Sequence, residues 1–107
     1  MNTISYKPLT VNRAWKGKRY KTDEYNQYER DLLYLLPKIT VPSGPLKIVF
    51  EFGLSSPLSD WDNCIKTTQD ILAKKYGFND KMIVEGSVKK VLVKKGEEYI
   101  KFDLVAA

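Results

Sequence analysis

Two segments of the chain carry hydrophobic residues at intervals of three and four positions, which is the period of an amphipathic helix. The first covers residues 23–36, with Thr22 in the N-cap position and Pro37 at the end. The second covers residues 62–76 and is followed by Gly77, a residue typical of a C-cap. The residues expected to pack inward are Tyr25, Tyr28, Leu32, Tyr34 and Leu35 or Leu36 in the first, and Ile65, Thr68, Ile71, Leu72 and Tyr76 in the second.

Four other segments have the alternation of period two that predicts strands. Residues 46–52 alternate most regularly, and residues 3–6 form a shorter candidate. Residues 83–93 and 98–105 alternate on either side of a four-residue loop, which favours a C-terminal β-hairpin. The order of elements predicts an α+β fold in which two main helices pack on one face of a mixed or antiparallel sheet.

Length and composition favour one soluble domain covering residues 1–107. No apolar run approaches the ~20 residues that span a bilayer, and the N-terminus lacks the pattern of a secretory signal. We therefore expect a protein that stays in the compartment where it is made, the cytoplasm. The single cysteine, Cys64, cannot form an internal disulfide and agrees with a reducing compartment.

The chain contains no histidine, which removes several kinds of chemistry. A Ser-His-Asp triad, a Cys-His pair and a histidine-ligated zinc site are excluded, and one cysteine cannot supply a structural zinc site. A catalytic site in this protein must be built from carboxylates, lysines, tyrosines and backbone groups.

The formal net charge of +5 favours a polyanionic partner, with nucleic acid as the first candidate. Cations and aromatic residues are interleaved just before the first predicted helix, a composition that suits phosphate contacts and base stacking. A solvated basic loop explains the same residues equally well. The candidate DNA-binding residues there are Asn12, Arg13, Trp15, Lys16, Lys18, Arg19 and Lys21.

Asp60 and Asp62 lie at the start of the second predicted helix. One alternative is that they are only an N-cap and a first-turn acid that satisfies the helix dipole. The other is that both carboxylates hold a hard cation, because Mg²⁺ binds through one or two carboxylates together with substrate phosphates. Without histidine, Mg²⁺ or Mn²⁺ is favoured over zinc.

Lys66 lies four residues after Asp62 and four before Asp70, so a helix would place all three on one face. These residues could form surface ion pairs of about 0.3 to 0.5 kcal/mol each. Alternatively, Lys66 could hold a phosphate or leaving-group oxygen beside the metal. Asn63 could orient a carboxylate or contact the substrate, whereas Cys64 has no neighbouring base and is expected to fill space.

A set of residues spread over most of the chain resembles the RusA family of Holliday-junction resolvases, which is common in phages and prophages. The set comprises Asp60-Trp61-Asp62-Asn63, Lys66, Asp70, Leu72, Gly77-Phe78 and Asp80, with Val11-Asn12 and Gly44-Pro45 upstream. Family members often have two acids in the last turn, where this chain has Asn79-Asp80.

The resemblance implies a Mg²⁺-dependent homodimeric endonuclease that resolves DNA four-way junctions by paired nicks in recombination and repair. It assigns three catalytic, metal-binding aspartates and a lysine to Asp60, Asp62, Asp80 and Lys66, with Asp70 in a supporting position.

The predicted second helix would separate Asp80 from Asp60 and Asp62 by roughly 20 Å at ~1.5 Å per residue. One chain could then hardly bring all three to one metal, so we expect composite sites in a two-fold dimer. Two further hypotheses stay open: a catalytically inactive DNA-binding homodimer that retains the fold, and a protein-interaction module with a basic face.

Overall fold

The computed structural model describes residues 1–10, 15–16, 20–58 and 60–107, and contains a four-stranded sheet, a two-stranded sheet and two α-helices. The elements in chain order are β1 (Asn2–Ile4), β2 (Trp15–Lys16), β3 (Tyr20–Lys21), α2 (Asp23–Leu35), β4 (Leu46–Leu54), α3 (Ile65–Tyr76), the 3₁₀-helix η1 (Asp80–Met82), β5 (Ile83–Leu92) and β6 (Tyr99–Ala106).

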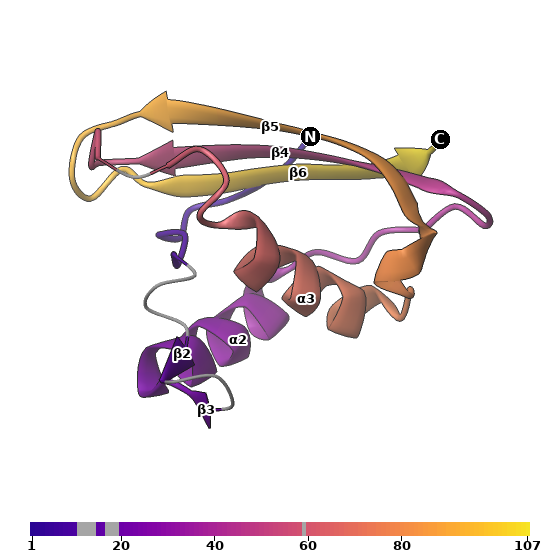
Figure 1. Ribbon diagram of the computed structural model, residues 1–107, viewed down its shortest axis with the longest axis horizontal. Coiled ribbons are helices and arrows are strands. Elements are labelled where there is room, and N and C mark those ends of the chain that lie inside the picture. The colour runs from indigo at the N-terminus through magenta and orange to yellow at the C-terminus, as the bar shows by residue number, and fades with distance from the viewer. Residues whose placement is uncertain (11–14, 17–19, 59) are drawn as a thin grey trace.

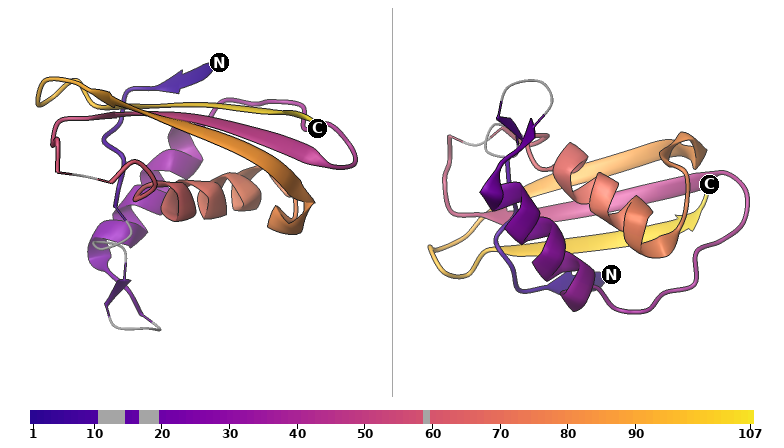
Figure 2. Two further views of the ribbon diagram at one scale, coloured as in Figure 1. Left: turned by 45° about the horizontal axis from the view of Figure 1, so that its top comes forward. Right: turned by 90° about the horizontal axis from the view of Figure 1, so that it is seen from below.

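The two helices lie side by side on one face of the main sheet, whose strand order is β1-β6-β4-β5 (Figures 1 and 2). β4 pairs antiparallel with β6 and parallel with β5, so the sheet is mixed. Alternate residues of β4 are buried toward the helices, namely Leu46, Ile48, Phe50 and Phe52. The predicted α+β class, with two helices on a mixed sheet, is therefore confirmed.

Both predicted C-terminal strands are present, but they do not pair with each other as a hairpin would require. β5 and β6 each form hydrogen bonds to β4, which lies between them. Their connection passes the end of β4, where the Val93 amide donates to the Leu54 carbonyl at 2.9 Å. Alternation and a short loop identify the two strands, but they do not show which strand each one pairs with. Here β4 is a buried strand in the middle of the sheet, and each of its two edges pairs with one of them.

The parallel pairing of β4 with β5 requires a long connection, and α3 provides it. The chain leaves β4 at one end of the sheet, returns along α3 beneath it, and enters β5 through η1 (Figure 1). This path places the turn before α3 and the turn after it far apart along the helix axis.

Thr22 caps α2 as predicted, because its side-chain oxygen accepts a hydrogen bond from the Tyr25 amide at 3.1 Å. Of the predicted inward residues, Leu36 is buried and Leu35 is exposed. The prediction that Tyr34 packs inward is wrong, since its side chain is 88% exposed. Tyr34 lies outside the three-and-four spacing that defines the buried face of the helix.

The buried faces of α2 and α3 meet through a polar contact within the core. The Tyr28 hydroxyl and the Thr68 hydroxyl are both buried and lie 2.9 Å apart. Burial raises the pKa of Tyr28 above its ordinary value, which keeps the phenol protonated as a hydrogen-bonding partner. This contact fixes the two helices relative to each other without leaving a buried hydroxyl unpaired.

α3 begins at Ile65 and not at Asp62, which corrects the predicted start of the helix. Residues 61–64 form a turn in which the Asn63 amide donates to the Asp60 carbonyl and the Ile65 amide to the Asp62 carbonyl, both at 3.2 Å. At its other end Gly77 adopts a left-handed conformation with φ of 70° and caps the helix as predicted.

The face of the main sheet away from the helices carries charges of both signs in cross-strand rows. Lys47 of β4 lies 3.9 Å from Glu85 of β5, and Lys101 of β6 lies 3.6 Å from Glu51 of β4. Tyr99 also donates a 2.6 Å hydrogen bond to Glu51. Because the charges compensate, this face is a poor candidate for the surface that attracts a polyanion.

Candidate functional site

The Asp60 and Asp62 side chains project from the turn that precedes α3, and both residues are exposed. Their backbone carbonyls hold the turn together by accepting the Asn63 and Ile65 amides. The backbone contacts fix the positions of the two residues, while the carboxylates remain open to solvent and to a ligand.

The structure does not use these two acids as caps. Cys64 occupies the N-cap position of α3 without a side-chain hydrogen bond, and the first turn holds no acidic residue. Within residues 1–10, 20–58 and 60–107, neither the Asp60 nor the Asp62 carboxylate has a hydrogen bond or ion pair. Two neighbouring carboxylates without a structural partner are free to take up a cation.

Lys66 and Asp70 pair with each other on the exposed side of α3, with their Nζ and Oδ1 atoms 3.0 Å apart. The expected shared helical face does not include Asp62, because this residue precedes the helix. An exposed ion pair of this kind contributes about 0.3 to 0.5 kcal/mol. A phosphate could therefore replace Asp70 as the partner of the Lys66 ammonium with only a small loss of free energy.

Asp80 lies at the opposite end of α3, as the first residue of η1. Its position is fixed by the cap of the 3₁₀-helix, where the Asn79 side chain accepts a hydrogen bond from the Lys81 amide at 2.9 Å. The twelve residues of α3 span about 18 Å at 1.5 Å per residue. Figure 1 shows η1 at the far end of α3 from the turn that carries Asp60 and Asp62.

The three aspartates do not meet in one copy of the chain. Among the residues that the structure describes, no three acidic or cysteine side chains form a group able to hold a metal. A site that uses all three aspartates requires Asp80 from a second copy, which is the arrangement that the sequence predicts.

Two residues inside the acidic segment have distinct environments. Asn63 is half-buried at the base of the turn, and Cys64 is almost fully buried beneath it. Burial raises the pKa of the Cys64 thiol to about 12, so the nucleophilic thiolate is scarce near neutral pH. Cys64 fills space in the core, as its sequence context predicts.

Most of the predicted basic DNA-binding segment lies outside the described residues. This applies to Asn12, Arg13, Lys18 and Arg19, and to the side chains of Trp15 and Lys16. β2 and β3 pair in a two-stranded ribbon beside the start of α2 (Figure 1). The two strands of the ribbon, Trp15–Lys16 and Tyr20–Lys21, lie at one end of the molecule.

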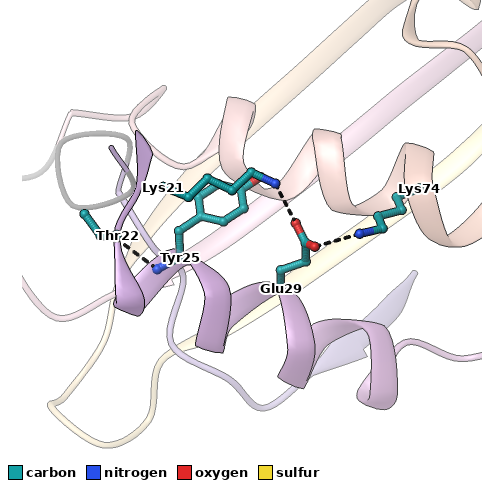
Figure 3. A network of polar contacts seen from close by, with 5 residues as sticks. All are labelled: Lys21, Thr22, Tyr25, Glu29 and Lys74. Atoms are coloured by element: carbon teal, nitrogen blue, oxygen red, sulfur yellow. Dashed lines mark hydrogen bonds and ion pairs between the residues drawn. The ribbon is translucent and has the colours of Figure 1, made fainter. Parts of the chain in front are cut away.

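Lys21 is the one predicted DNA-binding cation whose contacts are described, and it belongs to a network that joins the two helices (Figure 3). Its ammonium lies 3.2 Å from Glu29 and 4.8 Å from the centre of the Tyr25 ring. Lys74 of α3 reaches the other Glu29 oxygen at 2.8 Å. The charge of Lys21 is partly compensated within the protein, so a phosphate would have to compete with Glu29 to bind the Lys21 ammonium.

Sequence reasoning did not single out Trp61 or the apolar groove beside it. Trp61 is 60% exposed between the two aspartates and lines a groove of about 480 Å³. The other residues that line the groove come from β4, α3 and β5, and are Ile48, Phe50, Ile65, Gln69, Ile83, Gly86, Ser87 and Val88. The sequence did contain a signal for this groove, namely a tryptophan between two acids, Asp60 and Asp62. The acids indicate an exposed segment, and a large aromatic side chain in such a segment is costly to leave in solvent.

Comparison with models of known protein families and with curated proteins gives no match to this chain. None of the helices in the described ranges is long and apolar enough to cross a membrane.

Proposed function

We propose that the protein is a metal-dependent, structure-selective endodeoxyribonuclease that resolves DNA four-way junctions with Mg²⁺, for which Mn²⁺ can substitute. The observation that carries the proposal is the pair of exposed carboxylates, Asp60 and Asp62, which neither cap α3 nor pair with another described residue. The resemblance to RusA-family resolvases supplies the substrate, a branched DNA in recombination and repair.

The available donors fit a hard divalent cation. Asp60, Asp62 and Asp80 offer carboxylate oxygens, the ligands that Mg²⁺ and Mn²⁺ prefer, and the sequence contains no histidine to favour zinc. When bound, such a cation activates a water molecule and stabilises the charge that develops during in-line displacement at phosphorus. The carboxylates act in this scheme as ligands, and their exposure leaves room for the phosphate of the substrate.

Lys66 is proposed to neutralise a non-bridging or leaving oxygen of the scissile phosphate. It lies in the first turn of α3, close in sequence to the acidic turn, and is held in place by Asp70 at 3.0 Å. When DNA binds, the ammonium exchanges a weak surface ion pair for a contact to a phosphate in a less hydrated environment. Asp70 is then a positioning residue that orients Lys66 before substrate arrives.

Each active site is proposed to combine Asp60 and Asp62 of one subunit with Asp80 of the other. The length of α3 keeps these residues apart within one chain, and a two-fold dimer provides two equivalent sites. Two symmetric sites suit a four-way junction, which needs two symmetric nicks. The basic segment of residues 12–21 and Asn63 are proposed to contact the DNA backbone next to these sites, so affinity should fall steeply with salt.

The function is tested by incubating a synthetic four-way junction with Mg²⁺ and either the wild-type protein or Asp62→Asn. We expect paired nicks from the wild type and a loss of about a hundredfold or more in the nicking rate from the variant, because a metal ligand is removed. Asp103→Asn, an equal change on the open face of the sheet, is the matched control and should nick normally. A wild-type protein that binds junctions without nicking them under Mg²⁺ or Mn²⁺ would instead be an inactive DNA-binding homodimer.

A further inference from the structure

β5 is a ten-residue strand at the edge of the main sheet, and its outer side is unpaired within the described residues. An edge of this length exposes a row of backbone N–H and C=O groups that can pair with another strand. The opposite edge of the sheet is formed by β1, which has only three residues. The free edge of β5 is therefore the main site on this sheet where a further strand can be added.

Exposed hydrophobic side chains accompany this edge. Val84 is 64% exposed and Leu92 is 59% exposed, one near each end of β5, and Met82 is exposed just before the strand. The groove that Trp61 lines also reaches β5, since Gly86 and Val88 form part of its wall. Unpaired backbone and exposed apolar side chains on one edge together indicate a surface that another protein strand covers.

We propose that this edge is the homodimer interface: two copies of the chain pair their β5 strands antiparallel, with the two-fold axis passing at Ser87. The proposal deepens the proposed function, whose composite sites it would assemble, although its test requires neither DNA nor metal. An axis perpendicular to the sheet keeps the helices of both copies on one face and joins the two sheets into one.

Charge complementarity selects this register. Glu85 and Lys89 both lie on the open face of the sheet, opposite Lys47 and Glu51 of β4 respectively. An axis at Ser87 places Glu85 of each copy directly opposite Lys89 of the other copy, so that two equivalent ion pairs form. If the axis moves by one residue, each of these charges faces an uncharged residue, Ser87 or Ile83 in one direction and Val91 or Ser87 in the other. Opposite charges on directly facing residues favour the paired register.

The same register fits the groove on the helix face. Gly86 has no side chain, and a Cβ added there would be in ordinary contact with Ile48 at 3.4 Å. With the axis at Ser87, Val88 of the second copy lies opposite Gly86 and next to the groove that Trp61 lines. The small residue of one strand thus makes space for the branched residue of the other, in both copies.

Antiparallel pairing also brings together the two halves of the proposed metal site. η1, which carries Asp80, immediately precedes β5 and would lie beside the last part of β5 in the second copy. The turn with Asp60 and Asp62 lies on the same helix face, at the start of α3 (Figure 1). Only antiparallel pairing places the beginning of β5 in one subunit beside the end of β5 in the other.

The charge pair is tested with two single variants, Glu85→Lys and Lys89→Glu, analysed by sedimentation velocity without DNA or metal. Each variant alone places like charges opposite each other at two positions. We therefore expect its dimerisation affinity to be lower than that of the wild type by about tenfold or more. An equimolar mixture should regain dimers, because the introduced lysine of one variant then faces the introduced glutamate of the other, and the remaining Glu85 faces the remaining Lys89.

The mixture also controls for folding, because any cost of the substitutions within a chain is the same in the separate and the mixed samples. Lys101→Glu, on the same face but in the interior strand β6, should leave dimerisation unchanged. A wild type that stays monomeric at roughly 100 μM or more, a concentration at which even a weak specific interface would form, or variants whose mixture shows no recovery, would overturn the proposed interface.

The position of the axis is tested by oxidative cross-linking of Ser87→Cys. Residues facing each other on antiparallel strands have Cα atoms about 4.5 to 5.5 Å apart, within the range of a disulfide. We expect a covalent dimer from this variant and none from Val105→Cys on β6, and Cys64 is too buried to contribute. A dimer that fails to cross-link at residue 87 contradicts the register. A protein that dimerises in this way and never nicks DNA would confirm the interface and refute the nuclease proposal.

Discussion

At the scale of single residues, the acids of this chain differ in whether the fold uses them. Asp31 accepts hydrogen bonds from Tyr6 and Gln27, which hold the pKa of its carboxyl below the usual value. Asp70 holds Lys66. Asp60 and Asp62, in contrast, have no described side-chain partner, and their carboxylates are therefore the candidates for binding an external cation. Contacts, and not sequence spacing alone, distinguish the acids that the fold uses from those that stay open to solvent.

Thr22→Ala tests the cap of α2. The Thr22 side-chain oxygen accepts a hydrogen bond from the Tyr25 amide at 3.1 Å, so its removal should lower the free energy of unfolding by about 1 kcal/mol. Urea unfolding followed by circular dichroism measures the change. Thr40→Ala, an exposed position in the connector before β4, should leave the unfolding midpoint unchanged. Equal destabilisation by both variants would show that the cap has no specific role.

Features determined by neighbouring residues could be read from the sequence. The Thr22 cap and the left-handed Gly77 were predicted correctly because caps depend on a few adjacent backbone groups. The start of α3 was predicted three residues too early, since Asp60 and Asp62 have the composition of a helix N-terminus. Their carbonyls instead close a turn, and that geometry depends on how β4 delivers the chain to the helix.

At the scale of elements, Glu29 joins α2 to α3 and the ribbon. A hydrogen bond from Lys74, followed by one from Lys21, holds the pKa of the Glu29 carboxyl below its usual 4.5 (Figure 3). Because the folded pKa is lowered, this stabilisation is present above pH ~4.5 and is lost as the pH falls through the folded pKa. Protonation in acid should therefore loosen the contact between the two helices.

Glu29→Gln should reduce the free energy of unfolding by about 1 kcal/mol near pH 7, and by progressively less as the pH falls below about 4.5. Chemical unfolding at a series of pH values from about 3 to about 7 measures the difference from wild type across this window. Glu97→Gln, in the turn between β5 and β6, is the matched control. A difference between Glu29→Gln and wild type that stays constant through the acid range would contradict the ionic origin of the stabilisation.

The strands themselves could be predicted from alternation, but their order could not. The burial of Leu46, Ile48, Phe50 and Phe52 follows directly from the period of two in β4. β5 pairs with β4 and not with β6, and this pairing depends on residues that are far apart in the sequence. A strand that is buried on one face, such as β4, can still pair with a neighbour along each of its two edges. The short connection between β5 and β6 suggested a hairpin because local turn signals carry no information about a strand inserted between them.

At the scale of the whole molecule, one chain contains the parts of the proposed site at two ends of α3. The sequence predicts Asp60, Asp62, Lys66 and Asp80 as site residues, and the described structure places the last of these in η1, beyond the far end of the helix. Sequence reasoning missed Trp61 and the groove beside β5, because a groove is formed by residues distant in sequence. A free strand edge and divided acids are both explained if the functional unit contains two copies.

Complementation tests most directly the proposal that two subunits share each metal site. Asp60→Asn and Asp80→Asn are co-expressed with different tags, the mixed dimers are purified through both tags, and nicking of a four-way junction is measured with Mg²⁺. A shared site predicts that each variant alone is inactive. A mixed dimer would have one intact active site, about half of the wild-type number, and would make a single nick in each junction in place of paired nicks. If mixed dimers form and remain as inactive as either variant alone, the composite site is contradicted.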